Sequence, residues 1–125
     1  MIKNQKFITN AADLPECIGD LSAVKDALYA IGGKWKLPIL MALFGGNQRF
    51  NELLRGVIGI SSKILSNELK DLEENGFIQR KVIESYPLVV EYELKPYSYT
   101  LLDVVIALSE WGLMHREKLK NEFSS

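Results

Sequence analysis

The sequence contains one cysteine, Cys17, and one histidine, His115. A single cysteine cannot close a disulfide within the chain, and it offers too few thiolates for a structural zinc site. No glycine-rich loop follows a predicted strand to hold a phosphate group. We therefore expect no disulfide framework, no bound metal and no cofactor.

The residues that nucleophilic catalysis needs are also scarce. Cys17 or a serine would require a neighbouring base, and His115 is the only candidate base with a near-neutral pKa. No motif brings these residues together, and the paired carboxylates of the chain resemble solvated faces. The sequence therefore predicts a protein that is not an enzyme.

Long hydrophobic runs are absent. The longest, residues 37–44 and 101–108, stop at Gly45 or are broken by Asp103, far short of the roughly 20 apolar residues that span a bilayer. The first residues are followed by polar ones, unlike the apolar core of a secretory signal. We expect a protein without membrane segments that stays in the cytoplasm.

A strong net charge is missing as well, because 15 basic residues face 16 acidic ones, a net charge of −1. A typical nucleic-acid-binding domain is markedly basic. The charges are unevenly distributed, however. Residues 34–81 hold eight basic and five acidic residues, a net +3, and the remainder is −4. The middle of the chain is thus the part best suited to approach a polyanion.

Hydrophobic spacing predicts three helices in the first half. Residues 20–31 place Val24, Ala27 and Leu28 at helical intervals, residues 34–44 are almost wholly apolar, and residues 50–55 form a short helix. Glycines follow the first two of these helices, and Gly56 opens the turn after the third. A helix that is apolar all round belongs in the core.

Residues 60–76 predict the helix around which the chain is organised. Ser61 can cap its first turn, and Asn75-Gly76 supplies the left-handed residue that ends a helix. One stripe of this helix is apolar, and the opposite side is polar. The stripe consists of Leu65, Leu69 and Leu72, and the polar side of Lys63, Asn67 and Lys70 with Ser66 at its edge.

The second half of the chain changes period. Residues 77–84 and 89–95 are rich in β-branched and aromatic residues and predict a hairpin with its tip at residues 85–88. Two helices joined by a glycine-containing turn and followed by a hairpin form a winged helix-turn-helix. A last helix is expected from Tyr97 or Ser98 to about Phe123, with more apolar surface than one stripe needs.

We therefore predict an α+β, mainly helical fold with a two-stranded wing and a long C-terminal dimerisation helix. Its parts are an N-terminal arm over residues 1–19, a winged-helix core over 20–96, and the last helix over 97–125. A symmetric dimer would bury the excess apolar surface of that helix, because one patch on two copies can be self-complementary.

Several separated motifs in this order resemble the HxlR-type winged-helix transcriptional regulators, relatives of the MarR group. The resemblance extends from Cys17 to Trp111. It includes residues 31–35 (IGGKW), 49–54 (RFNELL), 59–61 (GIS) with Leu65, 69–76 (LKDLEENG), and Pro87, Val90-Glu91-Tyr92 and Leu94 in the wing.

The resemblance implies a homodimer that binds double-stranded operator DNA through the helix at residues 61–75. The C-terminal helix and the N-terminal region would form the dimer contact, and a small-molecule or redox effector is compatible with the family. A winged helix that binds a protein in place of DNA is a third class. Low overall basicity keeps that class open, since few phosphate contacts predict weak nonspecific affinity.

The polar side of the recognition helix supplies the candidate DNA contacts. Alone, it would be the solvated face of an amphipathic helix. Within a winged helix-turn-helix, a helix of this size fits the major groove, where Asn can pair with adenine and Lys or Ser with guanine or phosphate. The candidates are Ser61, Ser62, Lys63, Ser66, Asn67 and Lys70.

Basic residues outside this helix have two interpretations. Arg49, Arg55, Arg80 and Lys81 could hold phosphates or be ordinary surface charges. Of these we include Arg49, Arg80 and Lys81 among the predicted contacts. Relatives commonly present Pro-Pro-Arg at the wing, whereas this chain has Pro87-Leu88-Val89. We therefore expect the hairpin to contribute less to DNA binding than in typical relatives.

Cys17 also has two interpretations. A lone cysteine without a neighbouring cation is usually an inert small hydrophobe, and Glu16 disfavours the thiolate. The resemblance implies the second interpretation, a sensor cysteine, because the family often carries a cysteine near the N-terminus that in some members senses electrophiles or oxidants. A redox-sensing regulator that acts through Cys17 is thus the alternative function.

Overall fold

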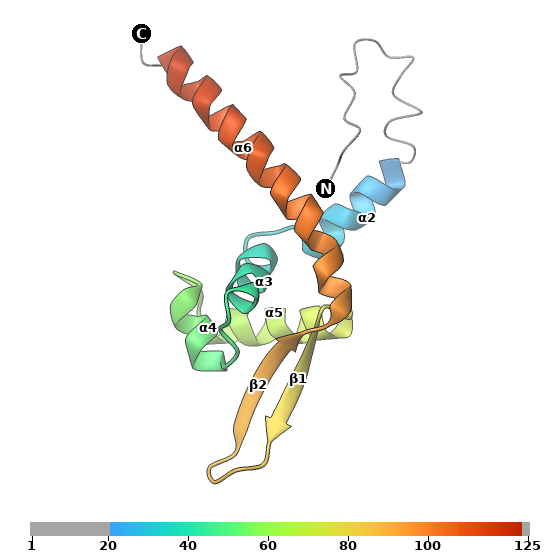
Figure 1. The fold of residues 1–125 in the computed structure, drawn as a ribbon, viewed down its shortest axis with the longest axis vertical. Coiled ribbons are helices and arrows are strands. Elements are labelled where there is room, and N and C mark those ends of the chain that lie inside the picture. Colours follow the sequence, from blue (N-terminus) through green and yellow to red (C-terminus); the bar gives the residue numbers. More distant parts are fainter. Residues whose placement is uncertain (1–20, 124–125) are drawn as a thin grey trace.

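The computed structural model describes residues 21–123. Its elements are α2 (Leu21–Ile31), α3 (Lys36–Phe44), α4 (Phe50–Gly56), α5 (Ser62–Glu74), β1 (Ile78–Ile83), β2 (Val89–Leu94), a 3₁₀ helix (Pro96–Leu101) and α6 (Leu102–Phe123). The wing and α6 extend from opposite ends of the body that α3, α4 and α5 form (Figure 1). The predicted winged helix-turn-helix is confirmed. The predicted arm, with Cys17, lies outside the described residues.

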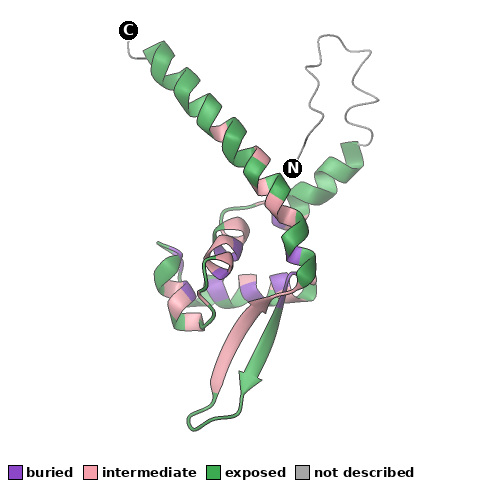
Figure 2. Ribbon diagram, viewed as in Figure 1, coloured by how far each residue is buried: buried purple, intermediate pink, exposed green. Residues whose placement is uncertain are grey.

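The hydrophobic core is built around α5. Leu65, Leu69 and Leu72 are at most 1% exposed, which confirms the predicted apolar stripe. They lie in one cluster with Ile39, Leu40 and Leu43 of α3, Leu53 of α4 and Ile78 of β1. Figure 2 shows this buried band along α5 and the facing side of α3. Every other element of the body packs against α5 or against a neighbour that does.

Both ends of α5 follow the sequence signals. The Ile64 amide donates to Ser61 Oγ at 3.2 Å, so Ser61 caps the first turn. Gly76 has a φ of +83°, a conformation that costs glycine little and other residues more. The Phe77 amide then donates to the Leu72 carbonyl at 3.0 Å. The chain therefore leaves α5 at a fixed angle and enters the wing directly.

The wing is tied to the start of α4 as well as to α5. β1 and β2 pair antiparallel, from Ile78 opposite Leu94 to Ile83 opposite Val89. On the other edge of β2, Arg49 and Glu91 form an isolated antiparallel bridge, and the Tyr92 amide donates to the Gln48 carbonyl at 2.7 Å. These bonds fix the orientation of the hairpin relative to α4.

The predicted start of the last helix is wrong by about one turn. Residues Pro96–Leu101 form a 3₁₀ helix, and the α-helix begins at Leu102. The reason is a long-range contact, because the buried Ser98 hydroxyl donates to the Phe77 carbonyl. This bond holds the segment close to the start of the wing, where a tighter turn fits.

The two helices farthest from this core leave apolar side chains uncovered. No residue of α6 is buried, and in α2 only Ile31 is. Within residues 21–123 no single helix is long and apolar enough to cross a membrane. Helices α2 and α3 are long and apolar enough for a membrane span only when taken together, and they are bent by 68° relative to each other.

The role of α5 in the core predicts a large loss of stability for Leu72→Ala. We expect the free energy of unfolding to fall by about 2–5 kcal/mol, because the substitution leaves a cavity between packed side chains. Lys70→Ala, on the exposed side of the same helix, should change it by less than about 0.5 kcal/mol. Urea denaturation at one fixed protein concentration measures both values, and equal losses would contradict the placement of α5.

Candidate nucleic-acid interface

The outward side of α5 presents six polar residues in one continuous surface. Ser61, Ser62, Lys63, Ser66, Asn67 and Lys70 are all exposed. Lys63, Asn67 and Lys70 stand opposite the buried leucines with Ser66 at the edge, as the spacing predicted, and Ser61 and Ser62 lie at the start of the helix. An α-helix is about 10–12 Å across with its side chains, and the DNA major groove, about 12 Å wide, admits one. The structure thus brings all six candidates on this helix together.

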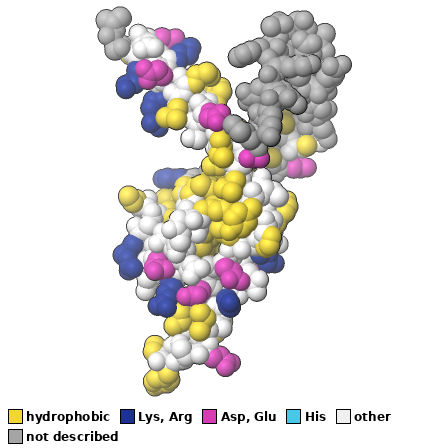
Figure 3. All heavy atoms as spheres, viewed as in Figure 1, with side chains coloured by type: hydrophobic (Ala, Val, Ile, Leu, Met, Phe, Trp, Pro, Cys, Tyr) yellow, Lys and Arg dark blue, Asp and Glu magenta, His cyan; other side chains and the backbone are white. Residues whose placement is uncertain are grey.

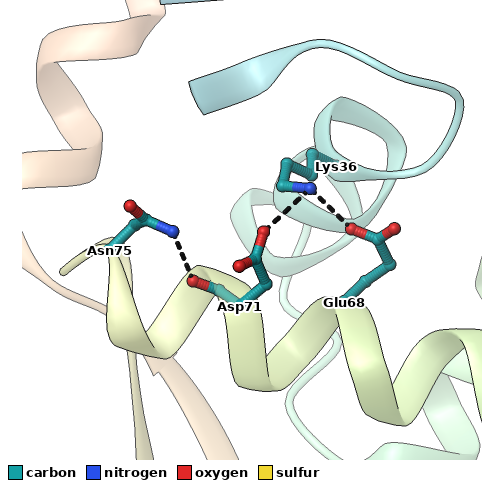
Figure 4. A network of polar contacts seen from close by, with 4 residues as sticks. All are labelled: Lys36, Glu68, Asp71 and Asn75. Atoms are coloured by element: carbon teal, nitrogen blue, oxygen red, sulfur yellow. Dashed lines mark hydrogen bonds and ion pairs between the residues drawn. The ribbon is translucent and has the colours of Figure 1, made fainter. Parts of the chain in front are cut away.

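Two acidic residues in the second half of α5, Glu68 and Asp71, form ion pairs with a lysine of α3. Lys36 Nζ at the start of α3 lies 2.9 Å from Glu68 Oε1 and 2.9 Å from Asp71 Oδ2. Figure 4 shows both carboxylates turned from α5 toward Lys36. The hydrogen bonds to Glu68 and then to Asp71 raise the pKa of Lys36. The cluster fixes α5 to α3 and reduces the negative charge beside the outward face.

Two further contacts fix the C-terminal end of α5. Glu73 Oε2 accepts a hydrogen bond from the Arg80 amide at 3.2 Å, and Asn75 Nδ2 donates to the Asp71 carbonyl at 2.8 Å. Like the Lys36 cluster, the Glu73 contact joins α5 to another element. The sequence shows that acidic residues crowd into this half of the helix. It does not show their partners, because these depend on how the elements pack.

Arg49 lies at the junction between α4 and the wing. Its Nε is 3.6 Å from Glu91 Oε2 of β2, and its side chain is 57% exposed. The carboxylate of Glu52 accepts from the Gln48 and Arg49 amides, both at 2.9 Å, and these bonds lower the pKa of Glu52. Arg49 is therefore exposed but already has a carboxylate partner.

Arg80 and Lys81 are both exposed on β1. They lie opposite Tyr92 and Glu91 of β2 respectively. Because successive side chains of a strand point to opposite faces, Arg80 and Lys81 lie on different faces of the wing. Only Lys81 shares a face with Glu91 and Arg49. The structure therefore separates two residues that the sequence analysis had grouped.

The tip of the wing is apolar. Tyr86 is fully exposed and Leu88 is 68% exposed. No basic residue occurs between Val82 and Val90. Figure 3 shows apolar side chains together with an acidic one at this end of the wing, beyond a band of mixed basic and acidic side chains. Cations close to the wing therefore come from its base and from α4.

A family model for the HxlR-like helix-turn-helix matches residues 30–120. The chain belongs to this family. Relatives include the HTH-type transcriptional regulator YybR of Bacillus subtilis (strain 168), 36% identical over 98 residues that cover 78% of each chain. The resemblance inferred from the motifs is thereby confirmed, and this HxlR-type chain is a winged-helix transcriptional regulator.

Solved structures support the same assignment. A MarR-family transcriptional regulator from Enterococcus faecalis V583 superposes with a TM-score of 0.73 at 31% identity, covering 94% of this chain and 99% of its own. The redox regulator HypR in its reduced form gives a TM-score of 0.72 at 35% identity, covering 79% and 98%. The arrangement of α4, α5 and the wing is therefore shared by regulators of this type.

The Lys36 cluster predicts a measurable loss of stability for Lys36→Met. We expect the free energy of unfolding to fall by about 1 kcal/mol, because two carboxylates lose a charge-assisted hydrogen bond. Lys118→Met is the matched control, since it removes an ion pair of 2.8 Å whose side chains are 63% and 52% exposed. Exposed pairs of this kind contribute about 0–0.5 kcal/mol. Equal losses would contradict the assigned role.

The pH dependence of the stability lost in Lys36→Met follows from the raised pKa of Lys36. A raised lysine pKa contributes stability that is fully present below the unfolded value, about 10.4, and is lost as the pH rises through the folded value. The difference between wild type and Lys36→Met should therefore stay constant from about pH 6 to pH 9 and shrink above that range.

Proposed function

We propose that this HxlR-type chain binds operator DNA sequence-specifically as a homodimer, with α5 in the major groove and the hairpin as its wing. The observation that supports this best is the continuous polar face of α5, beside which Glu68 and Asp71 are engaged by Lys36. A polyanion can thus approach the polar face of α5, although the net charge of the whole chain is −1.

Individual side chains have different roles in this proposal. Asn67 can donate to and accept from one adenine in the groove, which reads sequence directly. Lys63 and Lys70 reach phosphate or guanine, and Ser61, Ser62 and Ser66 can meet either. Arg49, Arg80 and Lys81 add phosphate contacts, which position the protein without reading sequence. Because Arg80 and Lys81 face opposite sides, we expect one of them to contribute more than the other.

The proposed homodimer rests on the uncovered faces of α2 and α6. Monomeric proteins rarely expose contiguous apolar patches beyond a few hundred Å². Here α6 exposes Val104, Ile106, Leu108, Trp111, Leu113, Met114, Leu119 and Phe123, and α2 exposes Leu21, Val24, Leu28 and Tyr29. A second copy related by a two-fold axis can cover both. It would also present two α5 helices to two half-sites of the operator.

Asn67→Ala tests the reading role of α5. We expect it to reduce the preference for operator over a scrambled duplex by about 10-fold or more, because a bidentate contact to a base is lost. Lys63→Gln should weaken binding to both duplexes alike and lower the salt slope by about 1. Fluorescence anisotropy at several salt concentrations, with a duplex selected from a random pool by the protein, measures both effects.

The same assay includes its own controls. Pro87→Ala should weaken binding much less than Asn67→Ala, since the wing tip carries no cation. A footprint with two half-sites about one helical turn apart would support the dimer. If the wild-type protein shows no saturable, salt-dependent binding, the proposal fails and a winged helix that binds protein becomes the better explanation.

The similarity to HypR, named a redox regulator, supports a second candidate, a regulator that senses oxidants through Cys17. Cys17 is the only thiol in the chain, so an oxidation response of this kind requires it. If Cys17 is the sensor, diamide should change the operator affinity of wild type and leave Cys17→Ser unchanged, because diamide acts on thiols. Identical responses of the two proteins would exclude the redox function.

A further inference from the structure

A cleft of about 480 Å³ opens between α4 and the outer part of the wing. One wall comes from α4 and its N-terminal flank, and the other from the end of the hairpin. The lining residues are Arg49, Phe50, Asn51, Glu52 and Arg55 on the first wall and Leu88, Val89 and Val90 on the second. Two cations and the Glu52 carboxylate therefore face an apolar strip across an open cleft.

The position of this cleft relates it to α5. Helix α4 leads into α5 through the turn at residues 57–61, and the wing follows α5 at once. In a helix-turn-helix, the second helix lies in the major groove while the first crosses the DNA backbone. A DNA strand bordering the groove that α5 occupies would therefore pass along α4, where the cleft opens.

The two arginines of the cleft differ in their present partners. Arg55 is exposed and makes no ion pair within residues 21–123. The carboxylate of Glu52, one turn earlier in α4, accepts hydrogen bonds from the Gln48 and Arg49 amides. Arg49 is held by Glu91 at 3.6 Å. Arg55 is thus available to an anion at once, whereas the Nε of Arg49 becomes available after it leaves a carboxylate.

Glu91 has a second cationic neighbour. Lys81 is its cross-strand partner in the wing, and side chains of such a pair lie on the same face, about 5 Å apart at Cβ. When Arg49 turns away, Glu91 still faces a positive charge. The exchange therefore leaves Glu91 with a counter-charge, which keeps its cost low.

We propose that this cleft anchors the DNA backbone beside the wing, with Arg55 binding a phosphate directly and Arg49 binding one in exchange for its partner Glu91. The apolar strip of Leu88 and Val89 fits the deoxyribose between successive phosphates. The inference rests on the proposed DNA-binding function and assigns Arg55 and Glu91 roles that the recognition helix does not supply. It also explains how a wing without a cation at its tip can lie against a polyanion.

Arg55→Gln tests the direct contact. It should weaken binding to operator and scrambled duplexes equally, by several-fold at low salt, and reduce the salt slope by about 1, because one phosphate contact is lost. Arg116→Gln, an exposed arginine of α6, is the matched control and should leave both quantities unchanged. An unchanged slope for Arg55→Gln would overturn the proposal.

Glu91→Gln tests the exchange. It frees Arg49 and should raise affinity for both duplexes, and the gain should vanish in Arg49→Gln/Glu91→Gln relative to Arg49→Gln alone. A gain that persists in the Arg49→Gln background would mean that Glu91 only repels DNA, and it would overturn the exchange. Circular dichroism melting of each variant separates a binding effect from misfolding.

These measurements separate a failure of the cleft proposal from a failure of the proposed DNA-binding function. If wild type binds no duplex, the DNA-binding function itself fails. If wild type binds, Asn67→Ala loses sequence preference, and Arg55→Gln and Glu91→Gln behave like wild type, then only the cleft proposal fails.

Discussion

Burial of the leucine stripe of α5 is the constraint on which the rest of this structure depends. Leu65, Leu69 and Leu72 are almost fully removed from solvent, and each such side chain contributes roughly 1.5–3 kcal/mol by its burial. Because α3, α4 and β1 share the same cluster, their positions follow from that of α5. The rotation of α5 about its own axis is thereby fixed, and its polar side can only face outward.

Electrostatics then decide what the outward side can meet. The chain as a whole is slightly acidic, yet four carboxylates of α5 and the wing have partners. Glu68 and Asp71 contact Lys36, Glu73 accepts the Arg80 amide, and Glu91 contacts Arg49. These contacts also join α5 and the wing to α3 and α4. The interactions that hold the elements in place are therefore the same ones that limit repulsion of a polyanion.

The two ends of the molecule differ in character. The end formed by α5 and the wing carries the polar face and the cleft, whereas α6 extends from the opposite end with no buried residue (Figure 1). The proposed two-fold dimer needs this division, because one end would meet the partner copy while the other remains free for DNA. In a single copy, α2 and α6 have too little contact to cover their apolar side chains.

The sequence by itself determined the local elements and their faces. Ser61, Gly76 and the leucine spacing predicted α5 to within a residue, since caps and periodicity act over one turn or a few. Only the tertiary structure decided the long-range pairs. Ser98 bonds the Phe77 carbonyl and replaces the expected start of α6 with a 3₁₀ turn, Lys36 engages Glu68 and Asp71, and β2 meets residue 49. Such contacts join residues from 21 to 42 positions apart, and no local pattern encodes them because they depend on how the elements pack.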